Sequence, residues 1–184
     1  FCEDILGTAD YTSEQLCITD DMLGNDRVFF LPYLMGERSP VNDTAARGVF
    51  VGMSLDTSRS DMTQAVLEGV AFAIRDSFEV AKSLGIPIAQ SKICGGGAKS
   101  PLWRKIIANV LGLKVDMIES EEGPGYGGAI LAAVGCGAFA SVKEATDALV
   151  KVVDTLDPDP ELVEKYNARY EQFRQIYPTR SRPT

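Results

Sequence analysis

The stretch from Lys92 to Trp103 constrains the fold of this 184-residue chain more than any other. A short run at 92–94 with strand character leads into three consecutive glycines, and Ser100 and Pro101 then supply an N-cap and a favoured first helical residue. Because glycine adopts positive φ without a steric penalty, the pattern predicts a strand, a glycine bend and a helix. The chain is therefore expected to contain a β-loop-α unit.

A glycine bend that leads into a helix suits phosphate or a nucleotide, because free backbone N–H groups lie there at the positive end of the helix dipole. The spacing around Lys99 and Ser100 matches neither the Walker loop nor the GxGxxG motif. A tight turn without a ligand accounts for the same residues about equally well. If a nucleotide does bind, a side chain added at Gly97 is expected to occupy the space through which the nucleotide approaches the loop.

The composition limits the chemistry that the chain can carry. Its formal net charge of −8 argues against nucleic acids and anionic membranes as partners, since both need a basic surface. The sequence contains no histidine, which excludes histidine-based acid–base catalysis and histidine metal ligands. The cysteines lie far apart without metal-ligand spacing, so no metal site is expected. They are interpreted as reduced thiols of a cytoplasmic protein, with Cys94 and Cys136 in the core.

The longest predicted helix lies at 60–84, with Ser60 as its N-cap and with Gly85 and Pro87 after its end. Five apolar residues four positions apart predict a stripe that faces the core: Met62, Val66, Val70, Ile74 and Phe78. Small residues beside the stripe, Gly69 among them, are expected to let another backbone approach closely.

Shorter elements complete an alternating pattern. Strands are expected at 28–31, 48–55, 92–94 and 114–118, and further helices near 12, at 101–111, at 126–135, at 141–153 and from 159 onward. The uncharged segment 123–142 is rich in glycine and alanine, which favours a tightly packed, buried helix over a membrane span. The alternation predicts a mixed α/β domain.

Four segments, in order, resemble the FGGY carbohydrate kinases and among them most closely the xylulokinases. Phe29–Pro40 resembles their LPYL-GER-[ST]-P segment, and 46–53 together with 61–68 resembles their second signature. The Gly-Gly-Gly-Ala loop with Ser100 and Trp103 is similar to the loop that approaches the nucleotide in these kinases. The fourth segment, 122–139, resembles their glycine- and alanine-rich stretch.

The resemblance implies an RNase H-like, actin-like ATPase domain with a mixed sheet flanked by helices, lacking its first strands. Residues 1–184 would be a partial C-terminal, nucleotide-binding domain, with 1–26 and 179–184 as peripheral segments. The implied substrate and ion are ATP and Mg²⁺. The implied partner is the N-terminal domain of the same kinase, which would carry the catalytic residue and most sugar contacts. A homodimer is a further expectation.

Carried over by position, the resemblance implies site residues in two loops. The expected nucleotide contacts are Gly95, Gly96, Gly97, Ala98, Lys99, Ser100 and Pro101. Pro101 stands where several relatives have an asparagine that contacts the nucleotide, and Ser100 would partly replace it. Gly36, Glu37 and Arg38 form a candidate cleft loop. The alternative for that loop is a Glu37–Arg38 ion pair that only pins it. Trp103 is expected to be a packing anchor beneath the glycine loop.

Two alternatives to a xylulose kinase stay open. The first keeps the fold and changes the substrate to glycerol, gluconate or ribulose. The second is a non-catalytic nucleotide-binding module with the actin-like fold, because a fold does not decide a function. The GERSP loop favours a kinase, since a simple nucleotide-binding module has no need of it.

Overall fold

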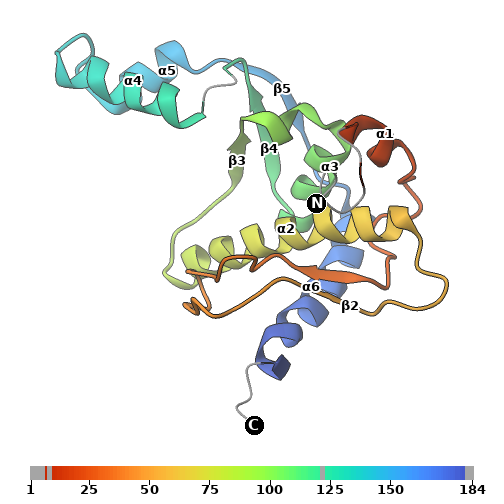
Figure 1. Cartoon of the computed structure of the whole chain (residues 1–184). Coiled ribbons are helices and arrows are strands. Elements are labelled where there is room, and N and C mark those ends of the chain that lie inside the picture. Colours follow the sequence, from red (N-terminus) through yellow and green to blue (C-terminus); the bar gives the residue numbers. More distant parts are fainter. Residues whose placement is uncertain (1–6, 8–9, 121–122, 181–184) are drawn as a thin grey trace.

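The computed structural model describes residue 7 and residues 10–120 and 123–180. Helix α2 (Arg59–Ser83) runs through the middle of the molecule (Figure 1). It packs against strand β1 (Phe29–Leu31) on one side and against helix α3 (Pro101–Leu111) on the other. The predicted α/β architecture is therefore organised around one long helix.

The described residues form two small sheets, one packed against α2 and the other against α3. In the first, β1 pairs antiparallel with β2 (Val49–Val51). The second has the order β3-β4-β5, with β3 (Gln90–Ile93) parallel to β4 (Lys114–Ile118), and β5 (Val152–Leu156) antiparallel to β4. This is the mixed sheet that the sequence analysis predicted. The strand expected at 48–55 is shorter than predicted.

Strand β5 is absent from the sequence-based prediction, which continued a helix to residue 153. Helix α5 (Val142–Leu149) instead ends at Leu149, with Ser141 as its N-cap. The residues that follow are mostly β-branched and pair with β4, where Asp116 lies opposite Thr155. Pairing with a distant strand decides the structure of this segment.

The unit around the glycines is built as predicted. Strand β3 leads into a short 3₁₀ turn, η1 (Gly96–Lys99), and α3 begins at Pro101. The Ser100 hydroxyl caps α3 by accepting a hydrogen bond from the Trp103 N–H at 3.0 Å. Gly112, at φ 61°, ends the helix in the left-handed region that glycine favours.

Helix α2 begins at Arg59, one residue earlier than predicted. Its N-cap is Ser58, which forms a capping box with Asp61, and not Ser60. The predicted stripe is only half-buried, because the fully buried face lies beside it and carries Ala65, Ala71 and Phe72. The expected close backbone approach is present. A Cβ at Gly69 would lie 2.1 Å from the Phe30 carbonyl oxygen.

Helix α6 (Pro160–Arg180) supplies the aromatic part of the core, as predicted. Leu162, Tyr166, Tyr170 and Phe173 are all buried. Three of these rings surround Phe72 of α2, at centroid distances of 5.2 to 6.1 Å. Segment 10–26, expected at the periphery, contributes Ile18 and Leu23 to the same core. The remaining residues of the two peripheral segments, 1–6, 8–9 and 181–184, lie outside the described part.

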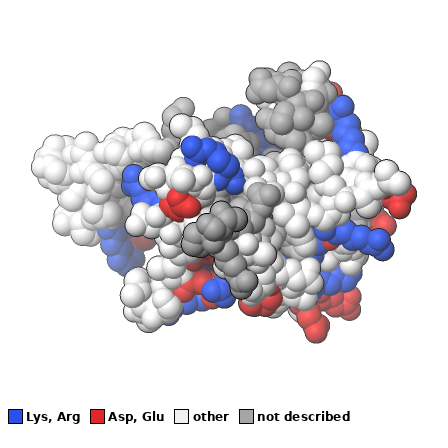
Figure 2. All heavy atoms as spheres, turned by 60° about the horizontal axis from the view of Figure 1, so that its bottom comes forward, with Lys and Arg blue, Asp and Glu red and all other residues white. Residues whose placement is uncertain are grey.

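Helix α4 (Gly123–Gly135) does not pack as predicted. It lies with α5 away from the rest of the molecule (Figure 1), and Ile130 is its one buried residue. Its uncharged surface forms the white lobe at the left of Figure 2. Cys94 and Cys136 are exposed, so the expectation that both lie in the core is wrong. Along the described ranges, no helix combines the length and the apolar character that crossing a bilayer requires.

Candidate nucleotide-binding site

The glycine loop leaves an open backbone surface at its first two residues. Gly95 has φ 82° and ψ −175°, a conformation that few other residues adopt. A Cβ built at Gly95 or Gly96 would meet nothing within 4 Å. Within the turn, the Ala98 and Ser100 N–H groups donate to the carbonyls of Gly95 and Gly97, each at 3.1 Å. A ligand can therefore approach the backbone closely at Gly95 and Gly96.

The space that a side chain at Gly97 would need is already filled by protein. A Cβ there would lie 1.7 Å from the Trp103 ring, which packs directly against the loop. Trp103 in turn packs against the main core. The expectation that a side chain at Gly97 would occupy the ligand's approach is wrong, because that space is filled by Trp103. Trp103 is the packing anchor that was predicted.

Helix α1 (Tyr11–Leu16) forms a wall beside the loop. The Ser100 hydroxyl donates a hydrogen bond to Gln15 Oε1, so the residue that caps α3 also holds α1. A second link joins Asp20 and Lys105, 2.7 Å apart. Because Gln15 Oε1 is engaged by Ser100, its amide Nε2 is left to donate elsewhere. The sequence analysis missed Gln15, since no local pattern marks a contact made 85 residues away.

Two hollows border the contact between Ser100 and Gln15. The larger has a volume of about 680 Å³ and lies between α1 and the start of α3. The smaller, of about 390 Å³, extends toward α2, where Thr63, Val66 and Leu67 line it. Both are bordered by Tyr11, Gln15, Gly96 and Ser100. Such volumes are typical of small-molecule sites.

The predicted loop residues border these hollows in part. Gly96, Lys99, Ser100 and Pro101 line the larger hollow, and Gly97 lines the smaller one. Gly95 and Ala98 face a third hollow of about 260 Å³ beside Cys94 and Arg104. The loop thus lies between three hollows, and two of them share Gly96 and Ser100.

The candidate cleft loop lies elsewhere. Helix α2 separates the β1 side of the molecule, which carries Gly36, Glu37 and Arg38, from the side that carries the glycine loop (Figure 1). The backbones of Glu37 and Asp43 exchange two hydrogen bonds, of 2.9 and 2.8 Å. Asp43 also accepts one from the Tyr177 hydroxyl of α6 at 2.6 Å.

The expected Glu37–Arg38 ion pair is absent from the described part of the chain, and the carboxylate of Glu37 accepts from the Ser39 N–H instead. The loop that carries Glu37 is therefore held in place by Asp43 and not by an ion pair with Arg38. The structure of this chain does not bring the two predicted loops together.

Comparison with known proteins identifies the family. Residues 9–136 match the profile described as "FGGY family of carbohydrate kinases, C-terminal domain". The chain is 34% identical over 155 residues, 84% of its length, to a xylulose kinase of Staphylococcus epidermidis. It is 32% identical over 156 residues to a ribulokinase of Mycolicibacterium smegmatis.

A solved structure described as a xyloylose kinase from Brucella ovis superposes on 96% of the chain with a TM-score of 0.84 and 34% identity. This likeness confirms the predicted actin-like fold. The chain spans 31% of the length of the S. epidermidis relative and 36% of the B. ovis chain. On this evidence the chain belongs to the FGGY family of carbohydrate kinases, and residues 9–136 correspond to the C-terminal domain of that family.

Proposed function

We propose that this chain is the nucleotide-binding part of a kinase that transfers the terminal phosphoryl group of ATP to a ketopentose, with D-xylulose as the first candidate. The observation that carries the proposal is the open glycine loop, at Gly95 and Gly96, inside a domain of the FGGY family. Relatives named as xylulose kinases, 34% identical over most of the chain, support the choice of sugar.

The residues of the loop fit a nucleotide. The described part of the chain offers no hydrogen-bond acceptor to the N–H groups of Gly96 and Gly97, so both can donate to phosphate oxygens. The hollow between α1 and α3 is large enough for a base and ribose, and Gln15 can donate its amide to a ring nitrogen there. In phosphoryl transfer such contacts act by positioning the phosphates.

The residues needed to hold a metal are not gathered in the described part of this chain. No group of three or more Cys, Asp or Glu side chains there has a metal-binding arrangement. In the proposal, Mg²⁺ bound to the nucleotide would neutralise part of its phosphate charge. The catalytic base and most sugar contacts are assigned to an N-terminal domain that closes over the loop. Self-association of the chain stays a prediction.

Ribulose is the second candidate substrate. The similarity to the M. smegmatis ribulokinase, at 32% identity over 84% of the chain, is close to the similarity to the xylulose kinases. A non-catalytic nucleotide-binding module receives less support, because the matched family is one of kinases.

A coupled ADP-release assay tests the proposal. The kinase that contains this chain together with an N-terminal domain is expected to turn over D-xylulose faster than D-ribulose, glycerol or gluconate. The 184-residue chain alone is expected to show no sugar-dependent ADP release. Turnover by the chain alone would place the catalytic residues within it. Absence of turnover with every sugar, in a folded protein that binds ATP, would favour the non-catalytic module.

A further inference from the structure

Helix α1, which borders the glycine loop, places no side chain in the core. It has six residues, and none of them is buried. Tyr11 and Leu16 are 52% and 75% exposed, so the helix gains little stability from apolar burial. Helices this short are unstable on their own in water. The position of α1 therefore depends on the contacts that attach it to its neighbours.

Two side chains of α1 attach it to the helices beside it. Glu14 pairs with Arg59 at the start of α2, and the Arg59 Nε lies 3.0 and 2.9 Å from the two carboxylate oxygens. The Arg59 side chain is 50% exposed, and exposed ion pairs contribute little to stability. Gln15 accepts one neutral hydrogen bond from the Ser100 hydroxyl. None of these four residues belongs to the main core, so both attachments can break without disturbing it.

The chain is anchored immediately after α1. Ile18 and Leu23 are 7% and 0% exposed and belong to the main core. Asp20 adds an ion pair with Lys105 of α3 at 2.7 Å. A movement of α1 is therefore confined to the residues before Ile18.

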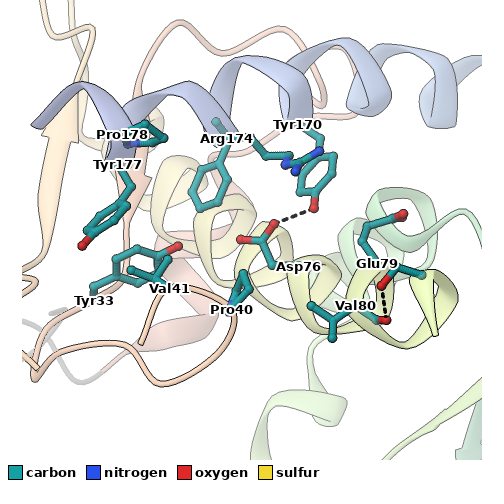
Figure 3. A pocket seen from close by; sticks show the side chains of 12 residues that line it. Tyr33, Pro40, Val41, Asp76, Glu79, Val80, Tyr170, Arg174, Tyr177 and Pro178 are labelled. Carbon is teal, nitrogen blue, oxygen red and sulfur yellow. Dashed lines mark hydrogen bonds between the residues drawn. The ribbon is translucent and has the colours of Figure 1, made fainter. Parts of the chain in front are cut away.

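Open volume lies where α1 faces the glycine loop, because Tyr11 and Gln15 border both hollows there. The cavity of about 330 Å³ between α2, α6 and the loop 33–41 has walls of the opposite kind (Figure 3). In that cavity Tyr170 of α6 is 2% exposed and donates a hydrogen bond to Asp76 of α2 at 2.5 Å. Such walls are fixed by the core, whereas α1 contributes no buried residue of this kind.

We propose that α1 is a strap that opens when the glycine loop is empty and closes when a nucleotide fills the two hollows. The nucleotide supplies the packing that α1 lacks, so binding and closure stabilise each other. Opening gives the nucleotide a path to Gly96, which lines both hollows. Because the closed form binds more tightly, a change that favours the open form weakens the apparent affinity for ATP. The inference rests on the proposed nucleotide site and adds a conformational step to it.

Hydrogen exchange of the protein, followed by mass spectrometry, tests the strap directly. Without ATP, the amides of 11–17 are expected to exchange almost as fast as those of an unfolded peptide, while those of α3 stay protected. Saturating ATP is expected to slow exchange in 11–17 about tenfold. Helix α6, which lines neither hollow, is the internal reference in both states.

Arg59→Gln provides a second test, because it removes the charge that holds Glu14. Arg59 lines neither hollow, so its effect on affinity is transmitted through α1. The variant is expected to bind ATP about threefold more weakly and to exchange faster in 11–17 at the same subsaturating ATP concentration. Arg59→Lys keeps the charge and should restore much of the affinity. Lys143→Gln breaks an exposed ion pair on α5 and is the matched control, which should change neither measurement.

Three results would overturn the strap while leaving the nucleotide site in place. The first is protection of 11–17 equal to that of α3 in the absence of ATP. The second is unchanged exchange in 11–17 when calorimetry shows that ATP is bound. The third is an Arg59→Gln protein with the parent's ATP affinity. If calorimetry detects no ATP binding to the parent protein, the proposed nucleotide site fails and the strap fails with it.

Discussion

The carboxylate of Glu68 on α2 and the guanidinium of Arg169 on α6 form an ion pair of 2.8 Å in the interior, although 101 residues separate them. Their side chains are 1% and 8% exposed. Gln64 and Tyr166 both donate to the other oxygen of Glu68, at 2.8 and 3.0 Å. This network joins α2 to α6, and both helices contribute buried residues to the main core.

Glu68→Gln is expected to lower the free energy of unfolding by about 3–5 kcal/mol, because Arg169 would keep its charge in the interior without a partner. Urea denaturation followed by circular dichroism measures the change. Glu79→Gln is the matched control on the same helix. Its carboxylate lies 3.0 Å from Lys82 at the surface, where such pairs contribute about 1 kcal/mol or less. Equal losses in the two variants would contradict this account.

Asp26→Asn is expected to stabilise the protein at neutral pH. Desolvation raises the pKa of Asp26 to about 6, and its Oδ2 is buried without a partner among the described residues. Between pH 3.8 and about 6 the folded state holds this proton more tightly than the unfolded state, so the contribution of Asp26 to stability falls as pH rises.

Asp26→Asn removes this pH-dependent loss of stability, because asparagine does not titrate. Allowing for partial exposure of the group, the gain at pH 7 is about 1–2 kcal/mol, or a few degrees in Tm. Thermal melts from about pH 3.5 to 7.5 should show the two proteins converging at acid pH. A constant difference across that range would show that Asp26 does not titrate as described.

Gly96→Val and Gly97→Ala are expected to change different properties, ATP affinity in the first variant and stability in the second. A Cβ at Gly96 meets no protein atom within 4 Å, so the variant is expected to fold normally and to lose affinity for ATP. At Gly97 even a methyl group meets Trp103, so this variant should lose stability. Calorimetry with ATP and thermal melts separate the two effects. Normal ATP affinity in a folded Gly96→Val protein would remove the loop from the proposed site.

Gln15→Ala is expected to weaken ATP binding by about tenfold, which corresponds to one lost hydrogen bond and some loss of order in α1. Inorganic triphosphate, which lacks the base, should bind equally well to parent and variant. Gln172→Ala on the exposed side of α6 is the control. An equal loss for ATP and triphosphate would mean that Gln15 does not contact the base.

Local signals allowed much of the fold to be predicted. The start of α3 follows from Ser100 and Pro101, because an N-cap and a first-turn proline act within a few residues of chain. The buried face of α6 follows from the spacing of Tyr166, Tyr170 and Phe173. The glycine bend is predicted by another local signal, the three consecutive glycines at 95–97.

Features that depend on distant partners were missed. Gln64, Glu68 and Asp76 lie outside the apolar stripe that helical periodicity predicts, yet they are buried. Glu68 and Asp76 bond to residues of α6, and Gln64 donates to the Met22 carbonyl. Gln15 depends in the same way on Ser100. The role of Gly97 was misassigned because sequence spacing does not reveal which side of the loop Trp103 occupies.

The three-stranded sheet has a consequence for handling the protein in solution. Along the described part of the chain, β3 and β5 each pair with β4 alone, so their outer edges carry unpaired backbone groups. On β5, Val152 and Val153 are also 45% and 61% exposed. An open edge with branched apolar side chains is a template for any extended peptide. The protein should therefore associate more as its concentration rises, and a lysine placed at Val153 should suppress that association without touching the core.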